Sequence, residues 1–109
     1  MSIASDLIRG HTDTIILAQL KKGDSYGYQI NKYIKMCTNG GYELKEATLY
    51  TAFKRLEGNG FIRSYWGDEN TGARRKYYSI TPVGDAVYTQ LLQEWNSAKQ
   101  IIDQLVAGE

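Results

Sequence analysis

Residues 46–80 read EATLYTAFKRLEGNGFIRSYWGDENTGARRKYYSI, and the spacing of their apolar residues changes part-way along. Leu49, Phe53 and Leu56 recur at i, i+4 and i+7. This spacing predicts a helix from about Glu46 to Gly58, with these three side chains on its inner face. The glycines that follow accept the positive φ on which helices commonly end.

Two runs rich in aromatic and β-branched residues come next, Phe61 to Trp66 and Arg75 to Ile80. Such composition is typical of strands, so we expect a two-stranded hairpin. The polar segment between them, Asp68 to Gly72, is long for a tight turn and predicts a loose, exposed tip.

Two helical patterns precede this stretch. The first runs from about Ser5 to Lys21 and ends at Gly23-Asp24. Its apolar residues recur at spacings close to 3.6: Leu7, Ile8, Ile15, Ile16, Leu17 and Leu20. The second, capped by Asp24 or Ser25, runs to about Met36 before Asn39-Gly40-Gly41. We expect its inner side to carry Tyr26, Ile30, Tyr33 and Ile34.

A last helix begins at Thr81, a suitable N-cap, with Pro82 at the first helical position. It runs almost to the C-terminus. Apolar residues along it follow alternating spacings of three and four, the heptad pattern of a coiled coil: Tyr88, Leu91, Trp95, Ala98, Ile102 and Leu105. The chain offers few other elements to cover this stripe. We therefore predict a homodimer in which this helix meets its copy, with help from the first helix.

The chain has 109 residues, 42% of them hydrophobic and 23% charged, which is ordinary for one soluble domain. Residues 1–80 carry twelve basic and eight acidic residues, whereas residues 81–109 carry one and four. This division favours an anionic partner for the first part. No secretory signal is evident, so we expect a cytoplasmic protein, and the lone Cys37 excludes an internal disulfide.

Three helices followed by a hairpin form the element order of a winged helix-turn-helix, in which the third helix lies in the major groove of DNA. The fold class is then mainly α with a small β-hairpin, plus one C-terminal dimerisation helix. Residues 1–80 would form the DNA-binding domain and residues 81–109 the dimerisation helix. The outer face of the third helix carries hydroxyls and cations suited to bases and phosphates, although an ordinary solvated face has the same composition: Thr48, Thr51, Lys54 and Arg55.

The cations Arg74, Arg75 and Lys76 stand where a wing meets phosphate. Alternation along a strand lets only part of the cluster face DNA, and we favour Arg75 with one flanking cation. A charged edge strand that resists aggregation is the alternative interpretation.

In this order the motifs resemble the PadR family of regulators over nearly the whole chain. The matching segments are Arg9-Gly10, Ser25-Tyr26-Gly27-Tyr28, Ala47-Thr48-Leu49-Tyr50, Arg55-Leu56-Glu57, Gly60-Phe61-Ile62, Arg74-Arg75-Lys76-Tyr77-Tyr78 and Ile80-Thr81. The single C-terminal helix looks like the family's smaller subfamily, which includes the lactococcal multidrug resistance repressor. Lys45 departs from the N-cap residue expected before the third helix.

This resemblance implies a dimeric repressor that binds double-stranded DNA at a palindromic operator and needs no cofactor. The family's DNA contacts carry over to Thr48, Tyr50, Thr51, Lys54, Arg74, Arg75 and Lys76. It also implies that a planar aromatic effector stacks on Trp95 at the dimer interface. Further effector-site residues would be Leu92, Asn96 and Lys99, with Leu7, Asp13 and Thr14 of the first helix.

Trp95 has two interpretations. A large indole on a heptad seam holds helices apart and leaves a cavity for a ligand, but tryptophan is also common as a plain subunit contact. Lys99 beside it would disfavour cationic compounds.

An enzyme is disfavoured, because His11 is the only histidine and no nucleophile, metal or phosphate motif is present. A winged-helix module that binds protein instead of DNA is the alternative function. Such a module has no need of the wing cations.

Overall fold

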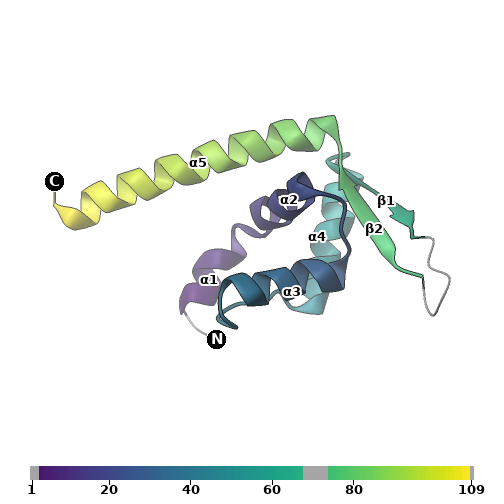
Figure 1. The fold of residues 1–109 in the computed structure, drawn as a ribbon. Coiled ribbons are helices and arrows are strands. Elements are labelled where there is room, and N and C mark those ends of the chain that lie inside the picture. The colour runs from purple at the N-terminus through teal and green to yellow at the C-terminus, as the bar shows by residue number, and fades with distance from the viewer. Residues whose placement is uncertain (1–2, 68–73, 109) are drawn as a thin grey trace.

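The computed structural model describes residues 3–67 and 74–108, and side chains from Asp6 onward. It has seven elements within these ranges: α1 (Ile3–Arg9), α2 (Thr12–Lys22), α3 (Gly27–Cys37), α4 (Glu46–Gly58), β1 (Ile62–Trp66), β2 (Lys76–Ile80) and α5 (Pro82–Ala107). The first four helices form a compact group, the hairpin projects from one side, and α5 crosses above α2 and extends away from the hairpin (Figure 1). The expected fold class is confirmed.

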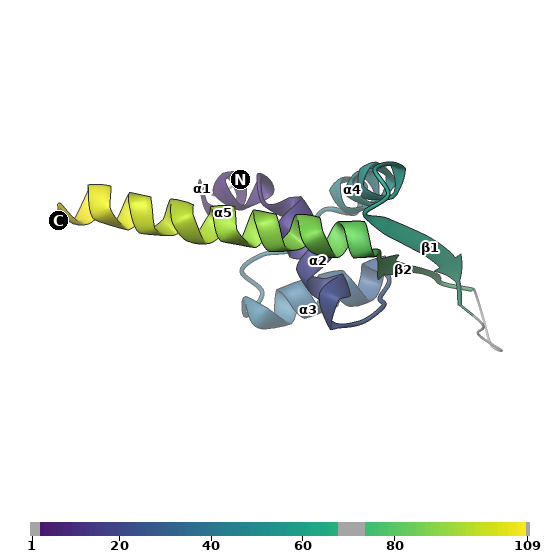
Figure 2. The same cartoon turned by 90° about the horizontal axis from the view of Figure 1, so that it is seen from above.

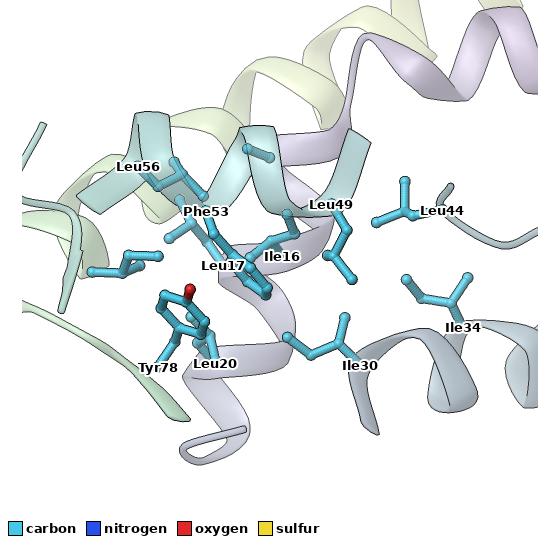
Figure 3. Close-up of a cluster of buried hydrophobic side chains, with 12 residues drawn as sticks. Ile16, Leu17, Leu20, Ile30, Ile34, Leu44, Leu49, Phe53, Leu56 and Tyr78 are labelled. Atoms are coloured by element: carbon cyan, nitrogen blue, oxygen red, sulfur yellow. The ribbon is translucent and has the colours of Figure 1, made fainter. Parts of the chain in front are cut away.

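The core lies where α2, α3, α4 and the hairpin meet (Figure 3). The inner face predicted for α4 is confirmed, since Leu49, Phe53 and Leu56 are all buried. Phe53 stacks on Tyr78 of β2 with ring centroids 4.0 Å apart. The remaining buried members come from every neighbouring element: Ile16, Leu17, Leu20, Ile30, Ile34, Leu44, Ala52 and Ile62.

The single N-terminal helix predicted from Ser5 to Lys21 is wrong, because the chain breaks it into α1 and α2 at Gly10-His11. The His11 N–H turns back to the Ile8 carbonyl, and the Thr12 hydroxyl donates to the Arg9 carbonyl over 2.8 Å. These bonds satisfy groups left over at a helix end. The apolar spacing continues across the break, which is why the pattern concealed it.

The cap predicted for α3 is also wrong. Tyr26 holds the N-cap position without a side-chain bond. Ser25 instead pairs with Tyr78 in an isolated antiparallel β-bridge, which adds a short third segment beside β2 of the hairpin. Asp24 is engaged by the hairpin as well. Ile30 and Ile34 are buried as expected, whereas Tyr33 is half-buried and accepts a bond from Lys22 Nζ.

The hairpin is antiparallel, with Tyr65 opposite Tyr77 and Trp66 opposite Lys76. The expected loose tip at Asp68 to Gly72 lies outside the described residues. The N-terminus of α5 is capped as predicted, since Thr81 Oγ1 accepts from the Gly84 N–H at 3.0 Å. The same hydroxyl donates to the Gly60 carbonyl and so ties α5 to the end of α4.

The 26-residue helix α5 packs against α2, and near its start Asp85 forms an ion pair with Lys21. Tyr88 and Leu91 of the heptad stripe pack against the core of their own chain, contrary to the expectation that the whole stripe lacked cover. Further along, α5 passes beyond the helical group and stands alone (Figure 2). Ile102 is 54% exposed and Leu105 77% exposed there, so the uncovered stripe is limited to the C-terminal half.

Candidate nucleic-acid interface

The exposed surface of α4 carries most of the residues expected to contact DNA. Thr51 and Lys54 are exposed, and Thr48 is half-buried at one edge of the same face. Ala47 between them is small and exposed, so the centre of this face is open to a partner. The surface therefore offers two hydroxyls and one ammonium group, the chemistry that reads base edges and binds phosphate.

Tyr50 lies on the other edge of α4, toward α3. Its ring meets Phe53 edge-on at 5.7 Å and is 48% exposed. A Cβ at Gly27 would come within 2.9 Å of the Tyr50 hydroxyl, so the start of α3 and this ring are in close approach. Tyr50 both packs between helices and presents its remaining surface beside the polar face.

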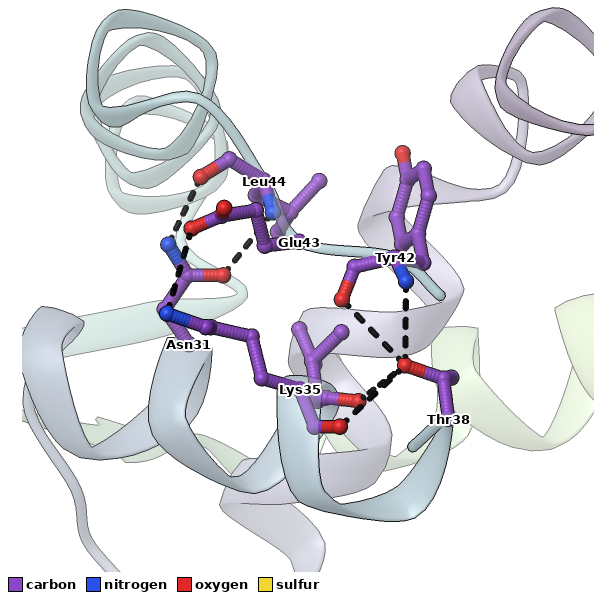
Figure 4. A network of polar contacts seen from close by, with 7 residues as sticks. Asn31, Lys35, Thr38, Tyr42, Glu43 and Leu44 are labelled. Atoms are coloured by element: carbon purple, nitrogen blue, oxygen red, sulfur yellow. Dashed lines mark hydrogen bonds and ion pairs between the residues drawn. The ribbon is translucent and has the colours of Figure 1, made fainter. Parts of the chain in front are cut away.

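The turn between α3 and α4 is fixed by side-chain hydrogen bonds (Figure 4). The Asn31 amide donates to the Leu44 carbonyl at 2.7 Å and accepts from the Leu44 N–H at 2.8 Å. At the other end of the turn, Thr38 Oγ1 accepts from the Tyr42 N–H and donates to the Ile34 carbonyl. These bonds determine how α4 is presented. Since Lys45 supplies no cap, they stabilise the approach to α4 in place of one.

The three wing cations are exposed, and each lies over an aromatic ring. Arg74 is 5.6 Å from the Trp66 ring centroid, Arg75 is 5.0 Å from that of Tyr26, and Lys76 is 6.0 Å from that of Tyr78. Cations held over rings keep their charge while losing some of their mobility. The wing thus presents a positioned set of positive charges.

The hairpin is joined to the α2–α3 turn by tyrosines. The Tyr65 hydroxyl donates to Asp24 at 2.6 Å, which raises the pKa of Tyr65 above its ordinary value of 10.0. Its ring stacks on Tyr77, and Tyr77 meets Tyr26 edge-on at 5.2 Å. Burial raises the pKa of Tyr78 on the opposite face of the strand. These contacts fix the wing relative to the α2–α3 turn.

The residues predicted for an effector site are only partly brought together. Trp95 is 38% exposed, its ring lies 4.7 Å from that of His11, and Lys99 Nζ stands 5.6 Å above it. Asp13 forms an ion pair with Arg55 of α4. The other members lie near the surface: Leu7 is exposed on α1, Thr14 is half-buried on α2, and Leu92 and Asn96 are exposed on α5.

The chain is similar to known proteins in sequence and in overall structure. The model of the transcriptional regulator PadR-like family matches residues 16–90 of the chain. The protein belongs to the PadR-like family. A transcriptional regulator from Clostridium thermocellum is similar in structure, with a TM-score of 0.87 and 52% identity over 96% of this chain and 99% of that one. A PadR family transcription regulator from Clostridium difficile has a TM-score of 0.76 and 37% identity, covering 88% and 98%.

The negative transcriptional regulator PadR of Bacillus subtilis is 31% identical over 94 residues, which are 86% of this chain and 50% of that protein. The chain thus spans half the length of this relative. As a PadR-like transcriptional regulator, the protein is a DNA-binding protein, in which α3 and α4 form the helix-turn-helix and the hairpin forms the wing. Within residues 3–67 and 74–108, no helix is long and apolar enough to cross a membrane.

Sequence reasoning missed two contacts of this PadR-like chain. The ion pair between Asp13 and Arg55 joins residues 42 positions apart, and Arg9 stands near the same part of α4. The spacing of residues along the sequence predicts neither contact, because both depend on how α1 and α2 pack against α4. In the sequence, Arg9 belongs to the Arg9-Gly10 motif, which does not indicate its place beside α4. Among the described residues, no group of three or more His, Cys, Asp or Glu side chains could hold a metal ion.

Proposed function

We propose that the protein is a transcriptional repressor that inserts α4 into the major groove of a palindromic operator and places its wing on the flanking backbone. The observation that carries this proposal is the set of three exposed wing cations, each positioned over an aromatic ring. The proposed contacts are Thr48, Tyr50, Thr51 and Lys54 of α4 with Arg74, Arg75 and Lys76 of the wing. Repression is supported by the name of the Bacillus subtilis relative, a negative transcriptional regulator.

The active form is a homodimer. Residues 1–80 act as the DNA-binding domain and residues 81–109 as the dimerisation helix, with α1 contributing to the interface. The exposed apolar side chains toward the end of α5 support this division, since a lone helix in water does not stably expose so many: Ile101, Ile102, Leu105 and Val106. Two copies of a protein related by a twofold axis match a palindromic site.

A planar aromatic effector binds beside Trp95 and relieves repression, as in the subfamily of the lactococcal multidrug resistance repressor. The partial exposure of Trp95 and its place at the end of the α2 contact support this site. The ring already carries Lys99 on one side and His11 near its edge. A ligand that stacks here therefore displaces at least one of them.

The DNA-binding proposal is tested by fluorescence anisotropy on a labelled duplex from the upstream region of the gene. A variant with Arg74, Arg75 and Lys76 changed to alanine is compared with wild type at several salt concentrations. We expect weaker binding and a salt slope shallower by up to about 2.7, because each phosphate contact contributes about 0.9. A matched control changes Lys21, Lys32 and Lys35, away from the wing, to alanine.

Equal affinity of the wing variant and wild type would remove the proposed role of the wing. If wild type binds neither this duplex nor an unrelated one, the protein-interaction module becomes the better explanation.

A further inference from the structure

A surface hollow of about 340 Å³ lies between α4 and the junction of α1 with α2. Its seven lining residues include two arginines and three threonines, and none of the seven is acidic: Arg9, Thr12, Ala47, Thr48, Thr51, Ala52 and Arg55. Arg9 ends α1, whereas Arg55 belongs to the last turns of α4. Two guanidinium groups thus approach one hollow from different helices, next to hydroxyl groups that can donate hydrogen bonds.

Each arginine is already paired with a carboxylate of α1 or α2. Arg9 binds Asp6 at 2.6 Å, and Arg55 binds Asp13. All four side chains are more than a third exposed. Exposed ion pairs contribute only about 0–1 kcal/mol, so exchange of the carboxylate for another oxyanion is inexpensive. A guanidinium fork fits phosphate by the same bidentate geometry as carboxylate.

The position of the hollow on α4 indicates which oxyanion it meets. A helix with its side chains is about 10–12 Å wide and the major groove about 12 Å, so the two edges of an inserted helix face the two DNA strands. Thr48 and Arg55 are seven residues apart, which is two helical turns, and both lie on the edge toward α1. The hollow therefore opens toward one strand while the outermost face of α4 meets the bases.

We propose that this hollow is an oxyanion site in which Arg9 and Arg55 hold a backbone phosphate of the bound DNA. The proposal rests on the proposed function, since it requires α4 in the major groove. Asp6 and Asp13 are the counter-ions of the two arginines in the free protein, and DNA displaces them. Asp13 therefore competes with DNA for Arg55, and its removal strengthens binding.

The loss-of-contact test measures anisotropy on the upstream duplex and on an unrelated duplex of equal length, between 50 and 200 mM KCl. Arg9→Gln and Arg55→Gln should each weaken binding roughly tenfold on both duplexes and make the salt slope shallower by about 0.9. The matched control is Lys21→Gln, which loses one cation and a similarly exposed ion pair with Asp85, at the far end of α2. Its slope should equal that of wild type.

A gain-of-binding test avoids the question of whether a weak variant is merely unfolded. Asp13→Asn should raise the affinity for both duplexes several-fold, because Arg55 no longer has to leave a carboxylate. Asp85→Asn removes an acidic group of similar exposure from the Lys21 pair and should leave the affinity unchanged. Equal effects of the two asparagine variants would overturn the competition between Asp13 and DNA.

Two further outcomes separate the proposals. If the wing variant weakens binding while both arginine variants behave like Lys21→Gln, the oxyanion site is wrong and the proposed function stands. If wild type binds no duplex, both the oxyanion site and the proposed function are wrong.

A further test uses NMR spectra of the DNA-free protein, recorded in inorganic phosphate and in chloride at equal ionic strength. Saturable shifts of the Thr48 and Thr51 amides would support an oxyanion site in the hollow, and shifts that persist in Arg9→Gln and Arg55→Gln would overturn the role of the two arginines.

Discussion

The Tyr65 hydroxyl donates a 2.6 Å hydrogen bond to the Asp24 carboxylate and so joins the hairpin to the turn before α3. This contact spans 41 residues of chain and is supported by the stacking of Tyr65 on Tyr77. The bridge between Ser25 and Tyr78 and the hydrogen bonds from Ser64 to Glu57 also link the hairpin to the helices. The bond therefore has consequences for stability that depend on pH.

Raising the pH above 10 should reduce the free energy of unfolding. The bond to Asp24 raises the pKa of Tyr65, and burial raises the pKa of Tyr78. Both tyrosines stay protonated in the folded protein at pH values where they ionise in the unfolded chain. Their stabilisation is complete below the unfolded pKa of about 10 and is lost as the pH rises through the higher folded values.

Urea unfolding at pH 8, 10 and 11 measures this effect. Tyr65→Phe should show a shallower fall in stability with pH than wild type, because one of the groups whose pKa folding raises is gone. Tyr28→Phe, at an exposed tyrosine of α3, serves as the control and should follow wild type. Identical curves for all three proteins would contradict the role of the Asp24 bond.

Gly84→Ala should destabilise the protein although alanine favours helices. A Cβ at Gly84 would lie 1.9 Å from the Phe61 carbonyl oxygen, so the start of α5 would have to move away from the hairpin. Overpacking of this kind costs about 1–3 kcal/mol. In the control Gly58→Ala, a Cβ meets nothing within 4 Å, and a gain of up to about 1 kcal/mol is expected. Denaturant midpoints of the two variants should move in opposite directions.

Asn31→Ala should both destabilise the protein and weaken DNA binding. It removes two hydrogen bonds to the Leu44 peptide group and leaves that group without partners, at a cost of about 1–3 kcal/mol. The orientation of α4 relative to α3 becomes less well fixed, while the number of phosphate contacts stays the same. Affinity should thus fall with an unchanged salt slope, unlike in the wing variant. An exposed position just after α4 provides the control Asn59→Ala; a loss there equal to that of Asn31→Ala would contradict the specific role of the turn.

The sequence predicts a helix well where the periodicity of its apolar residues agrees with the residues that mark its ends. The bounds of α4 were predicted correctly because Leu49, Phe53 and Leu56 lie between a polar start and Gly60, whose φ is +78°. The break between α1 and α2 was missed because Ile8 and Ile15 keep the helical spacing across it. At this break the Thr12 hydroxyl donates a hydrogen bond to the Arg9 carbonyl. The spacing of apolar residues does not reveal such a local polar contact.

The candidate site was predictable in its exposed residues and not in its pairings. Exposure of Thr51 and Lys54 follows directly from the helical period. The partners of Asp13 and Asp24 do not, since each carboxylate meets a residue more than 40 positions away. Such pairs depend on the packing of whole elements, which a single sequence pattern does not encode.

Leu105→Glu should convert a wild-type dimer into a monomer. Leu105 is 77% exposed within the chain, so the substitution leaves the folded subunit unstrained and acts only on a partner's approach. Loss of one buried leucine per subunit, about 1.5–3 kcal/mol each, predicts at least a hundredfold increase in the dimer dissociation constant. Sedimentation equilibrium at micromolar concentration measures it, with Gln104→Glu as the matched control. A monomeric wild type would refute the dimer itself.

Lys99→Gln should improve the binding of planar cations at Trp95. The ammonium group stands 5.6 Å from the centroid of the indole, where it occupies the electron-rich face and repels a second cation. Removing it should strengthen binding of acridine orange several-fold and leave a neutral planar compound, anthracene carboxamide, unchanged. Trp95→Phe should weaken binding of both. Ligand fluorescence anisotropy is the measurement, since Trp66 contributes a background to protein emission. If Trp95→Phe binds both probes as tightly as wild type, stacking at this position is excluded, and Trp95 acts only as a contact within or between subunits.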